Sequence, residues 1–464
     1  MIRILHAYFP TRTLFLGISE ACLVSLAFLA ATVARLGRGA TAYLFDYPHG
    51  SVKILVASLA IIMCMNYFDL YTSSILRSRR EIVIRLTQVL GTVYSLSVLL
   101  YYLYPPLELG RGIFVIGLLF AATVLLIWRE LFLMINRVPE FSARTLVLGD
   151  GPVGQSLIRE LGSRPELGMR VVGQLKTWEN GSNKTAQNSP AQDAEAFLAS
   201  INFYQPDHIV VARGEQIGSF PMEALLQLKS KGVYIHDSAE LYEAVTGKIP
   251  PEALRLSWLL FSPGFRISRR SVVIKRSVSF VLSFIGVVIT LPLMGLIALA
   301  IYLDSGAPVI FKQERVGLHG RIFILYKFRT MVVGNDDGRN PQPTEIADRR
   351  FTRIGRVLRR TRLDELPQLM NILLGDMDFI GPRPFVPNQE RDCLENIPHY
   401  RHRWTIRPGV TGWAQVNRGY NVTIEDNKEK LAYDLYYIKN QSVGLDLLVL
   451  LKTFKVALLG LGSR

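Results

Sequence analysis

The chain has 464 residues, enough for two or three units with their own cores, and 49% of them are hydrophobic. The mean hydropathy is positive, which argues against an ordinary soluble protein and predicts membrane-embedded segments. A net charge of +15 indicates anionic partners. The arginines adjoin apolar stretches and no nucleic-acid recognition module is present, so lipid headgroups and phosphorylated substrates are favoured over nucleic acid. The three cysteines have no metal-binding spacing and predict no disulfide framework.

Four apolar runs come first, at residues 13–34, 52–70, 83–103 and 112–136. Each approaches the roughly 20 residues with which a helix crosses a bilayer, and the first has no small-residue cleavage site after it. Arginines gather in the link between the second and third runs. The positive-inside bias therefore places the N-terminus, the 71–82 loop and everything after Arg137 in the cytoplasm. Glu20, within the first run, predicts either an intramembrane contact or a polar group at a helix end or helix pair.

The next region alternates strand and helix. An apolar strand at 145–148 runs into Gly149, Gly151 and Gly154, a helical spacing follows, and further strands are expected at 170–175, 208–212 and 233–237. This order predicts a parallel, doubly wound sheet of the Rossmann type. The polar stretch from Thr177 to Gln192 predicts a loop.

The glycine pattern has the context of a dinucleotide fingerprint, but the second strand runs into Lys176 where an acidic residue would hold ribose. An NAD site in this region is therefore a weakly supported alternative, and no cofactor-binding residue is assigned. Glycines that ease a tight turn and helix packing are the favoured interpretation, and a regulatory or oligomerisation role stays open.

A fifth apolar run, at residues 277–303, contains Pro292 near its middle. On pattern alone an ordinary kinked span would be the better interpretation. Both flanks are basic, however, and a crossing would place the arginine-rich segment 349–362 outside the cell. We predict a re-entrant helix that bends at Pro292 and returns to the same face, with Ser283 or Thr290 meeting the freed backbone groups.

A cluster of cations and acids follows. One adjacent carboxylate pair, Asp364–Glu365, stands among cations that can offer charge-assisted donors to phosphates, namely Lys327, Arg329, Arg362, Arg383 and Arg407. Such a pair is expected to stay ionised, and beside a diphosphate it can bind Mg²⁺ or attack phosphorus. The alternative is a solvated Arg/Glu helix face. The Pro/Gly turns GPRP and RPGVTG favour the site, because rigid turns preorganise phosphate donors.

Two segments predict contact with a membrane surface. Apolar residues recur at helical spacing within the arginine-rich stretch at Phe351, Ile354, Val357 and Leu358, which indicates an amphipathic helix on the bilayer. The last apolar run contains Asp446, Lys452 and Lys455, which favour an interfacial helix over a span.

Residues 265–464 resemble the catalytic domain of the bacterial sugar transferases, the monotopic phosphoglycosyl transferases. The whole chain resembles the large subgroup that initiates exopolysaccharide or O-antigen assembly and adds four N-terminal helices and a Rossmann-like domain. The matching motifs are Lys275–Arg276, Pro292, PVIFKQ (308–313), KFRTM (327–331), DELPQ (364–368), GPRP (381–384) and RPGVTG with Gln415–Val416. The chain departs from the family pattern at Ser279, at Leu291 and in the turn 305–308.

The resemblance implies roles for the matched positions. Asp364 would be the nucleophile that takes up sugar-1-phosphate and releases UMP. Glu365 would help to place Mg²⁺, with Asp364 as the other carboxylate. Lys327 and Arg329 would hold the acid pair and the phosphates, and Arg383 and Arg407 would contact phosphate or uridine. Arg362 and Gln415 are further candidate substrate-binding residues. Lys275, Arg276 and Pro292 would belong to the membrane hairpin.

The predicted fold is a membrane α-helical bundle (1–138), an α/β Rossmann-like domain (139–262) and a mixed α/β monotopic catalytic domain with a re-entrant membrane helix (263–464). The predicted activity is transfer of a hexose-1-phosphate from a UDP-sugar to polyprenyl phosphate at the cytoplasmic face of the bacterial inner membrane, with Mg²⁺ as cofactor and phospholipid as surroundings. No residue pattern reads a sugar hydroxyl, although the resemblance suggests glucose or galactose. A dimer is plausible from the size of the membrane and α/β units.

Two other functions compete with this prediction. A membrane-bound, NAD-dependent sugar-nucleotide enzyme would need a Tyr-x-x-x-Lys pair, but Tyr242 is followed by Thr246. A non-enzymatic scaffold of polysaccharide secretion would leave the arginine-framed acid pair without a purpose. Release of UMP from a UDP-sugar distinguishes the transferase from both.

Overall fold

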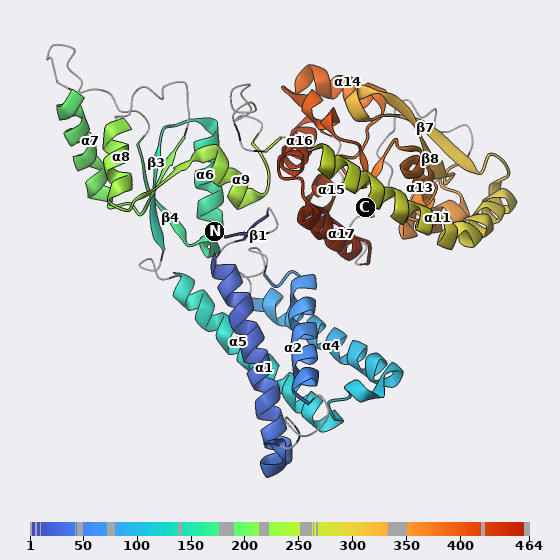
Figure 1. Cartoon of the computed structure of the whole chain (residues 1–464), viewed down its shortest axis with the longest axis horizontal. Coiled ribbons are helices and arrows are strands. Elements are labelled where there is room, and N and C mark those ends of the chain that lie inside the picture. Colours follow the sequence, from blue (N-terminus) through green and yellow to red (C-terminus); the bar gives the residue numbers. More distant parts are fainter. Residues whose placement is uncertain are drawn as a thin grey trace. The chain divides into compact units, whose positions relative to one another are not determined.

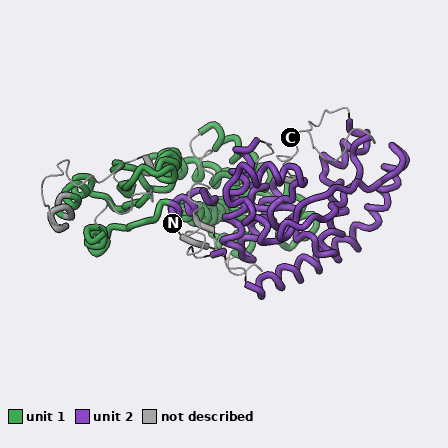
Figure 2. Tube along the Cα trace, turned by 90° about the horizontal axis from the view of Figure 1, so that it is seen from above, with its two compact units in different colours: residues 1–2, 9–238 green, residues 3–8, 239–464 purple. Residues whose placement is uncertain are grey.

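A computed structural model of the chain describes residues 2–4, 7–9, 11–41, 43, 50–71, 79–137, 142–175, 190–212, 222–250, 262, 264–265, 268–332, 350–418 and 423–458. The chain forms two compact units, one of residues 1–2 and 9–238 and one of residues 3–8 and 239–464 (Figure 2). The three-domain division drawn from the sequence stays a prediction. The contacts group the N-terminal helices with the parallel sheet and assign residues 239–250 to the C-terminal unit.

The four predicted apolar runs form four long helices of the first unit (Figure 1): α1 (Thr11–Leu36), α2 (Gly50–Tyr67), α4 (Arg79–Leu103) and α5 (Arg111–Arg137). All four are long and apolar enough to cross a membrane. Short 3₁₀ turns, η1 (Gly37–Gly39) and η3 (Pro105–Leu107), lie beyond the ends of α1 and α4. Phe28, Ile61, Val89 and Leu125 meet in the core of the bundle, whereas many leucines and valines on the outer faces are exposed, as lipid contact requires.

Glu20 pairs two of these helices. Its carboxylate accepts from Arg129 of α5, with Nε–Oε1 at 2.6 Å and Nη2–Oε2 at 3.1 Å, and the two side chains are 0% and 1% exposed. Arg129 also donates to the carbonyl of Leu70 at 3.0 Å. Glu20 is therefore a helix-pairing polar group, which ties α1 to α5 and to the turn after α2.

The predicted parallel sheet is confirmed. Its strands run in the order β4 (Met169–Leu175), β3 (Ala143–Leu148), β5 (His208–Val211) and β6 (Tyr234–Asp237), and each pairs parallel with its neighbour. Helices α7 (Pro190–Tyr204) and α8 (Met222–Ser230) cover one face, and α6 (Pro152–Ser163) covers the other (Figure 1). The turn η5 (Pro165–Leu167) joins α6 to β4. Of the predicted loop 177–192, residues 177–189 lie outside the described part of the chain.

The glycine loop packs closely against Ala212. A Cβ on Gly149, whose φ is +101°, would lie 2.6 Å from the carbonyl oxygen of Ala212, and one on Gly154 would lie 2.7 Å from the Cβ of Ala212. The amide of Gln174 donates to the carbonyl of Gly149 at 2.8 Å. Tight turning and close helix packing account for these glycines, in agreement with the favoured interpretation.

The second unit is a mixed α/β structure. It contains the antiparallel hairpin β7 (Ile310–Val316) and β8 (Ile322–Phe328) around η8 (Leu318–Gly320), and the parallel pair β9 (Asp378–Ile380) and β10 (Gly409–Thr411). Its helices are α9 (Ser238–Thr246), α11 (Arg269–Ser305), α12 (Arg353–Thr361), α13 (Gln368–Leu374), α14 (Pro387–Asn396), α15 (Trp413–Asn417), α16 (Ile424–Lys439) and α17 (Val443–Leu458). Helix α16 lies at the centre of the core, with Leu431, Leu435 and Tyr436 almost fully buried. Two further short strands, β1 (Ile2–Ile4) and β2 (Ala7–Phe9), pair with each other.

The fifth apolar run is one continuous helix, α11, which contains Pro292 and visibly changes direction along its length (Figure 1). One expectation about Pro292 was wrong. Within this part of the chain the Thr290 hydroxyl donates to the carbonyl of Gly286 at 2.7 Å, and the buried Ser283 hydroxyl has no hydrogen-bond partner. Neither therefore meets a backbone group freed by the proline, because Thr290 bonds within its own helical turn and Ser283 bonds to no group in the described residues.

Both ends of α11 are held by the second unit. Near the N-terminal end, Arg276 donates to the carbonyls of Ile372 and Leu373 at the end of α13. Near the C-terminal end, Asp304 accepts from the backbone N–H of Ile354, and Ile297 and Ile301 pack against Phe328 and Leu358. Between these anchors the helix exposes an apolar surface, with only 11% of its most apolar stretch buried.

Candidate active site

The acid pair lies in a tight turn between two helices. Helix α12 ends at Thr361, and Arg362 adopts a left-handed conformation with φ of 60° as its C-cap. The turn η9 (Leu363–Glu365) follows, and Pro367 precedes α13. The left-handed cap reverses the direction of the chain. Both carboxylates therefore project from the same turn, close to Lys327 near the end of β8.

Glu365 is the anchored member of the pair. Its Oε1 lies 3.0 Å from the Nζ of Lys327 and 3.7 Å from the Nη2 of Arg383. Burial raises the pKa of Glu365, but the charges of Lys327, Arg383 and Arg362 outweigh it and lower the pKa to about 2. Glu365 is therefore a permanent anion that holds two cations in place.

Asp364 has the opposite character. Its side chain is buried, with 8% of the residue exposed. Burial raises the pKa of Asp364, and the negative charge of Glu365 raises it further, against the lowering effect of Lys327, Arg359 and Arg362. Because a more basic, less hydrated carboxylate is a better nucleophile, Asp364 is the member suited to covalent chemistry.

Arg383 reaches the pair from the loop after β9. The N–H of Gly381 donates to the carbonyl of Thr411 at 2.9 Å, and the N–H of Gly409 donates to that of Pro382 at 3.0 Å. A Cβ on Gly381 would lie 2.4 Å from the carbonyl oxygen of Arg407, so these turns are packed backbone against backbone. The GPRP and RPGVTG motifs thus form one rigid support for Arg383.

A buried network behind this loop was not predicted. Arg403, in η10 (Tyr400–Thr405), donates to the carbonyl of Arg383 at 2.8 Å and forms ion pairs with Glu390 at 3.1 Å and Asp434 at 3.0 Å. All three ionic side chains are almost fully buried. The sequence carries no signal for this network, because its members lie on three separate elements and each reads as an ordinary surface charge.

Other predicted site residues have structural partners. Arg329 donates through Nη2 to Ser305 and to the carbonyl of Gly306, so it fixes the end of α11, while its buried Nε and Nη1 lack partners within the described structure. Arg407 donates to the carbonyl of Gly375 at 3.0 Å, just beyond α13, and Gln415 donates to that of Val410 at 3.1 Å. Of the predicted set, Lys327 and Arg383 pair with Glu365, and Arg362 directly precedes the acid pair. The binding roles of all the predicted residues remain predictions.

The two carboxylates of the acid pair are of the ligand type that Mg²⁺ prefers. No group of three or more His, Cys, Asp or Glu side chains that could hold a metal occurs among the described residues. Mg²⁺ beside phosphates commonly takes only one or two protein carboxylates and completes its shell with phosphate oxygens and water. Asp364 and Glu365 supply that number.

Comparisons with known proteins match two regions of the chain. A family model described as bacterial sugar transferase matches residues 270–460, and one described as a CoA-binding domain matches residues 66–203. The chain is 40% identical over 237 residues to the UDP-N-acetylgalactosamine-undecaprenyl-phosphate N-acetylgalactosaminephosphotransferase of Aeromonas hydrophila, a match that covers 50% of the chain but only 53% of that protein. It is 29% identical over 390 residues to the undecaprenyl-phosphate glucose phosphotransferase of Komagataeibacter xylinus, covering 78% of the chain and 72% of that protein.

A shorter relative, most of whose length is matched, shows the family to which the chain belongs. The UDP-glucose:undecaprenyl-phosphate glucose-1-phosphate transferase of Caulobacter vibrioides is 40% identical over 198 residues, which are 42% of the chain and 74% of that protein. The matched segment carries the acid pair and its cations. The chain therefore belongs to the bacterial sugar transferase family.

Proposed function

We propose that the protein transfers a hexose-1-phosphate from a UDP-sugar to polyprenyl phosphate and releases UMP, as the first membrane step of a polysaccharide pathway. The observation that carries this proposal is the division of labour in the acid pair. Asp364 is buried with a raised pKa, next to a Glu365 that Lys327 and Arg383 hold as a permanent anion. The names of the relatives, which are UDP-sugar and undecaprenyl-phosphate transferases, support the same reaction.

The first step forms a covalent intermediate. A carboxylate oxygen of Asp364 attacks the phosphorus that bears the sugar, and the bond from that phosphorus to the UMP oxygen breaks, so that UMP leaves with the electron pair. Lys327 and Arg383, fixed at 3.0 Å and 3.7 Å from Glu365, offer positive charge to the phosphate oxygens as negative charge develops.

The second step returns the enzyme to its starting form. A phosphate oxygen of polyprenyl phosphate attacks the same phosphorus, the aspartyl–phosphorus bond breaks, and Asp364 regains its charge. The products are a polyprenyl-diphosphate sugar and free enzyme. A covalent intermediate suits two substrates of different solubility, because they never need to be bound together.

Asp364 and Glu365 would hold Mg²⁺ together with the diphosphate. When bound, the ion would neutralise phosphate charge as a Lewis acid. The protein itself contributes the nucleophile and the two cations that Glu365 holds in place.

The ends of α11 support a cytoplasmic, one-sided arrangement. Residues 276 and 304 are both bonded to the second unit, so the helix is held at both ends by the same compact body. A helix that crossed the bilayer would separate its ends by roughly 30 Å of hydrocarbon. A re-entrant helix, with the catalytic unit on the cytoplasmic side where UDP-sugars are available, fits these anchors.

The deciding experiment follows the covalent intermediate. Purified protein incubated with a UDP-hexose labelled in the sugar phosphate is expected to release UMP and to retain the label at Asp364, and polyprenyl phosphate is expected to discharge it. UMP release without a protein-bound label would overturn the two-step mechanism. Absence of UMP release with every UDP-hexose tested would overturn the function.

A further inference from the structure

Residues Ala239–Pro250, called the docking segment below, follow the parallel sheet but pack within the catalytic unit. Strand β6 ends at Asp237 and α9 begins at Ser238, so no loop separates the sheet from this segment. In sequence the segment reads as the last helix of the α/β region. In the structure, however, it packs against α16, the helix at the centre of the catalytic core.

Buried charges fix the start of the segment. Glu243, which is almost fully buried, lies 2.6 Å from the Nζ of Lys439 and accepts from the side-chain amide of Asn440 at 2.7 Å. Lys439 and Asn440 are the last residue and the C-cap of α16. A buried ion pair with a second hydrogen bond holds the segment in one register on α16.

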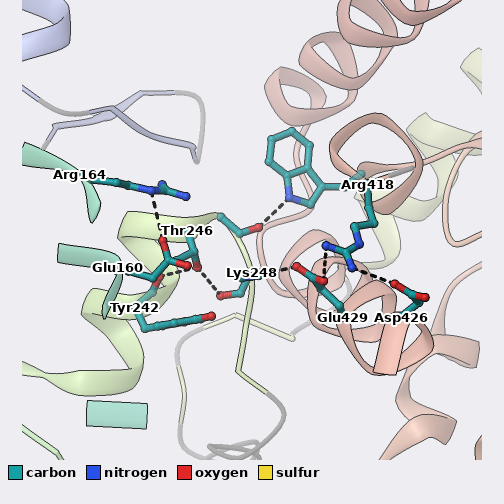
Figure 3. A network of polar contacts seen from close by, with 10 residues as sticks. Glu160, Arg164, Tyr242, Thr246, Lys248, Arg418, Asp426 and Glu429 are labelled. Carbon is teal, nitrogen blue, oxygen red and sulfur yellow. Dashed lines mark hydrogen bonds and ion pairs between the residues drawn. The ribbon is translucent and has the colours of Figure 1, made fainter. Parts of the chain in front are cut away.

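A second set of charges fixes its end (Figure 3). Lys248 lies 3.1 Å from Glu429 of α16, and Glu429 lies 2.7 Å from Arg418. The ammonium group of Lys248 also lies over the rings of Tyr242 and Tyr433, at 6.0 Å and 5.7 Å from their centroids. The side chain is therefore enclosed on several sides.

Between these charges the backbone enters the core. The N–H of Ile249 donates to the carbonyl of Ala432 at 3.0 Å, and the Ile249 side chain is fully buried. The carbonyl of Gly247 accepts from the indole N–H of Trp413 at 2.8 Å. Gly247 has φ of +65°, and a Cβ there would contact the Trp413 ring at 3.4 Å, so the turn fits closely against the indole.

Two short routes lead from these contacts to Arg383. Trp413 comes directly after Gly412, on which a Cβ would lie 2.2 Å from the carbonyl oxygen of Gly381, at the start of the loop that carries Arg383. Along the second route α16 supplies Asp434 to Arg403, which donates to the carbonyl of Arg383. Both routes consist of packed backbone and buried polar groups, which have little freedom to absorb a shift.

We propose that the docking segment is a positioning element of the transfer site, and that Lys248 and the Gly247–Trp413 contact hold α15 and α16 in the arrangement that aims Arg383 at Glu365. The proposal rests on the function given above. Lys248 touches no substrate, and it acts on sugar-phosphate binding through Arg383. The catalytic unit on this view begins at residue 239 rather than at 263.

The test uses the full-length protein with two variants. Lys248→Met keeps the aliphatic stem between the tyrosines and removes the charge, and Trp413→Phe keeps an aromatic ring and removes the indole donor. Each is expected to raise KM for the UDP-sugar or to lower kcat/KM by about three- to tenfold while the melting temperature stays within a few degrees of wild type. The double variant Lys248→Met with Glu429→Gln is expected to lose no more than Glu429→Gln alone, since Lys248 acts through Glu429, which also pairs with Arg418.

Lys428→Met is the matched control, because Lys428 lies on α16 next to Glu429, has no partner among the described residues and should behave as wild type. Wild-type kinetics in both Lys248→Met and Trp413→Phe would overturn the proposal. So would losses that follow the fall in melting temperature, because a merely structural contact behaves in that way. Failure of the wild-type protein to release UMP would instead overturn the proposed function.

Discussion

The division of acidity between Asp364 and Glu365 is the central feature at the scale of single residues. The two carboxyl groups are neighbours in sequence, yet one pKa is raised and the other is lowered to about 2. The difference arises because Glu365 meets Lys327 and Arg383 directly, whereas Asp364 is buried with more distant cations. In the proposed mechanism, Glu365 is the anchor and Asp364 the nucleophile.

Removal of the proposed nucleophile gives the first prediction. Asp364→Asn should reduce UMP release by more than about 10⁴-fold, because an amide cannot form the phosphoryl bond. The variant should remain folded and membrane-bound, measured by its melting temperature and by flotation with lipid vesicles. Substantial residual turnover would show that another residue attacks phosphorus.

The coupling between the two acids gives a prediction in pH. In the proposed mechanism Asp364 attacks as a carboxylate, so activity should fall as the pH drops through its pKa, which lies above the ordinary 3.8. The charge of Glu365 raises that pKa, so Glu365→Gln should move the acid limb of the UMP-release profile to lower pH, on a reduced maximum rate. A limb that stays in place or moves upward would contradict this coupling.

At the scale of elements, the pairing of α1 with α5 depends on a buried charge pair. Glu20→Gln would leave Arg129 charged and uncompensated in the bundle, and should destabilise the protein by about 3–5 kcal/mol. Glu20→Gln combined with Arg129→Met should recover part of the loss. Thermal unfolding in detergent measures both effects.

Glu130 offers the matched control for this pair. It forms an ion pair with Arg79 at 2.9 Å at a more exposed position, so Glu130→Gln should change stability by about 1 kcal/mol or less. Equal losses in Glu20→Gln and Glu130→Gln would show that burial does not set the strength of the Glu20 pair.

At the scale of the whole molecule, the prediction concerns topology. In a protein whose three native cysteines have been replaced, single cysteines at the exposed positions Ser268 and Glu314, on either side of α11, should react with a membrane-impermeant thiol reagent only after the inner membrane is opened. A cysteine at Arg38, beyond α1, should react from outside. Reaction of Glu314→Cys from outside in intact cells would show that α11 crosses the membrane.

Local patterns in the sequence were sufficient for much of this molecule. Apolar length predicted four long helices, strand–helix alternation predicted the parallel sheet, and adjacent acids among arginines marked the candidate site, because each of these signals lies within a short stretch of chain. Tertiary structure alone decided which cations meet Glu365, how Arg403 supports Arg383, and that residues 239–250 pack with α16. These depend on contacts between residues far apart in the chain, whose burial and partners no local spacing reveals.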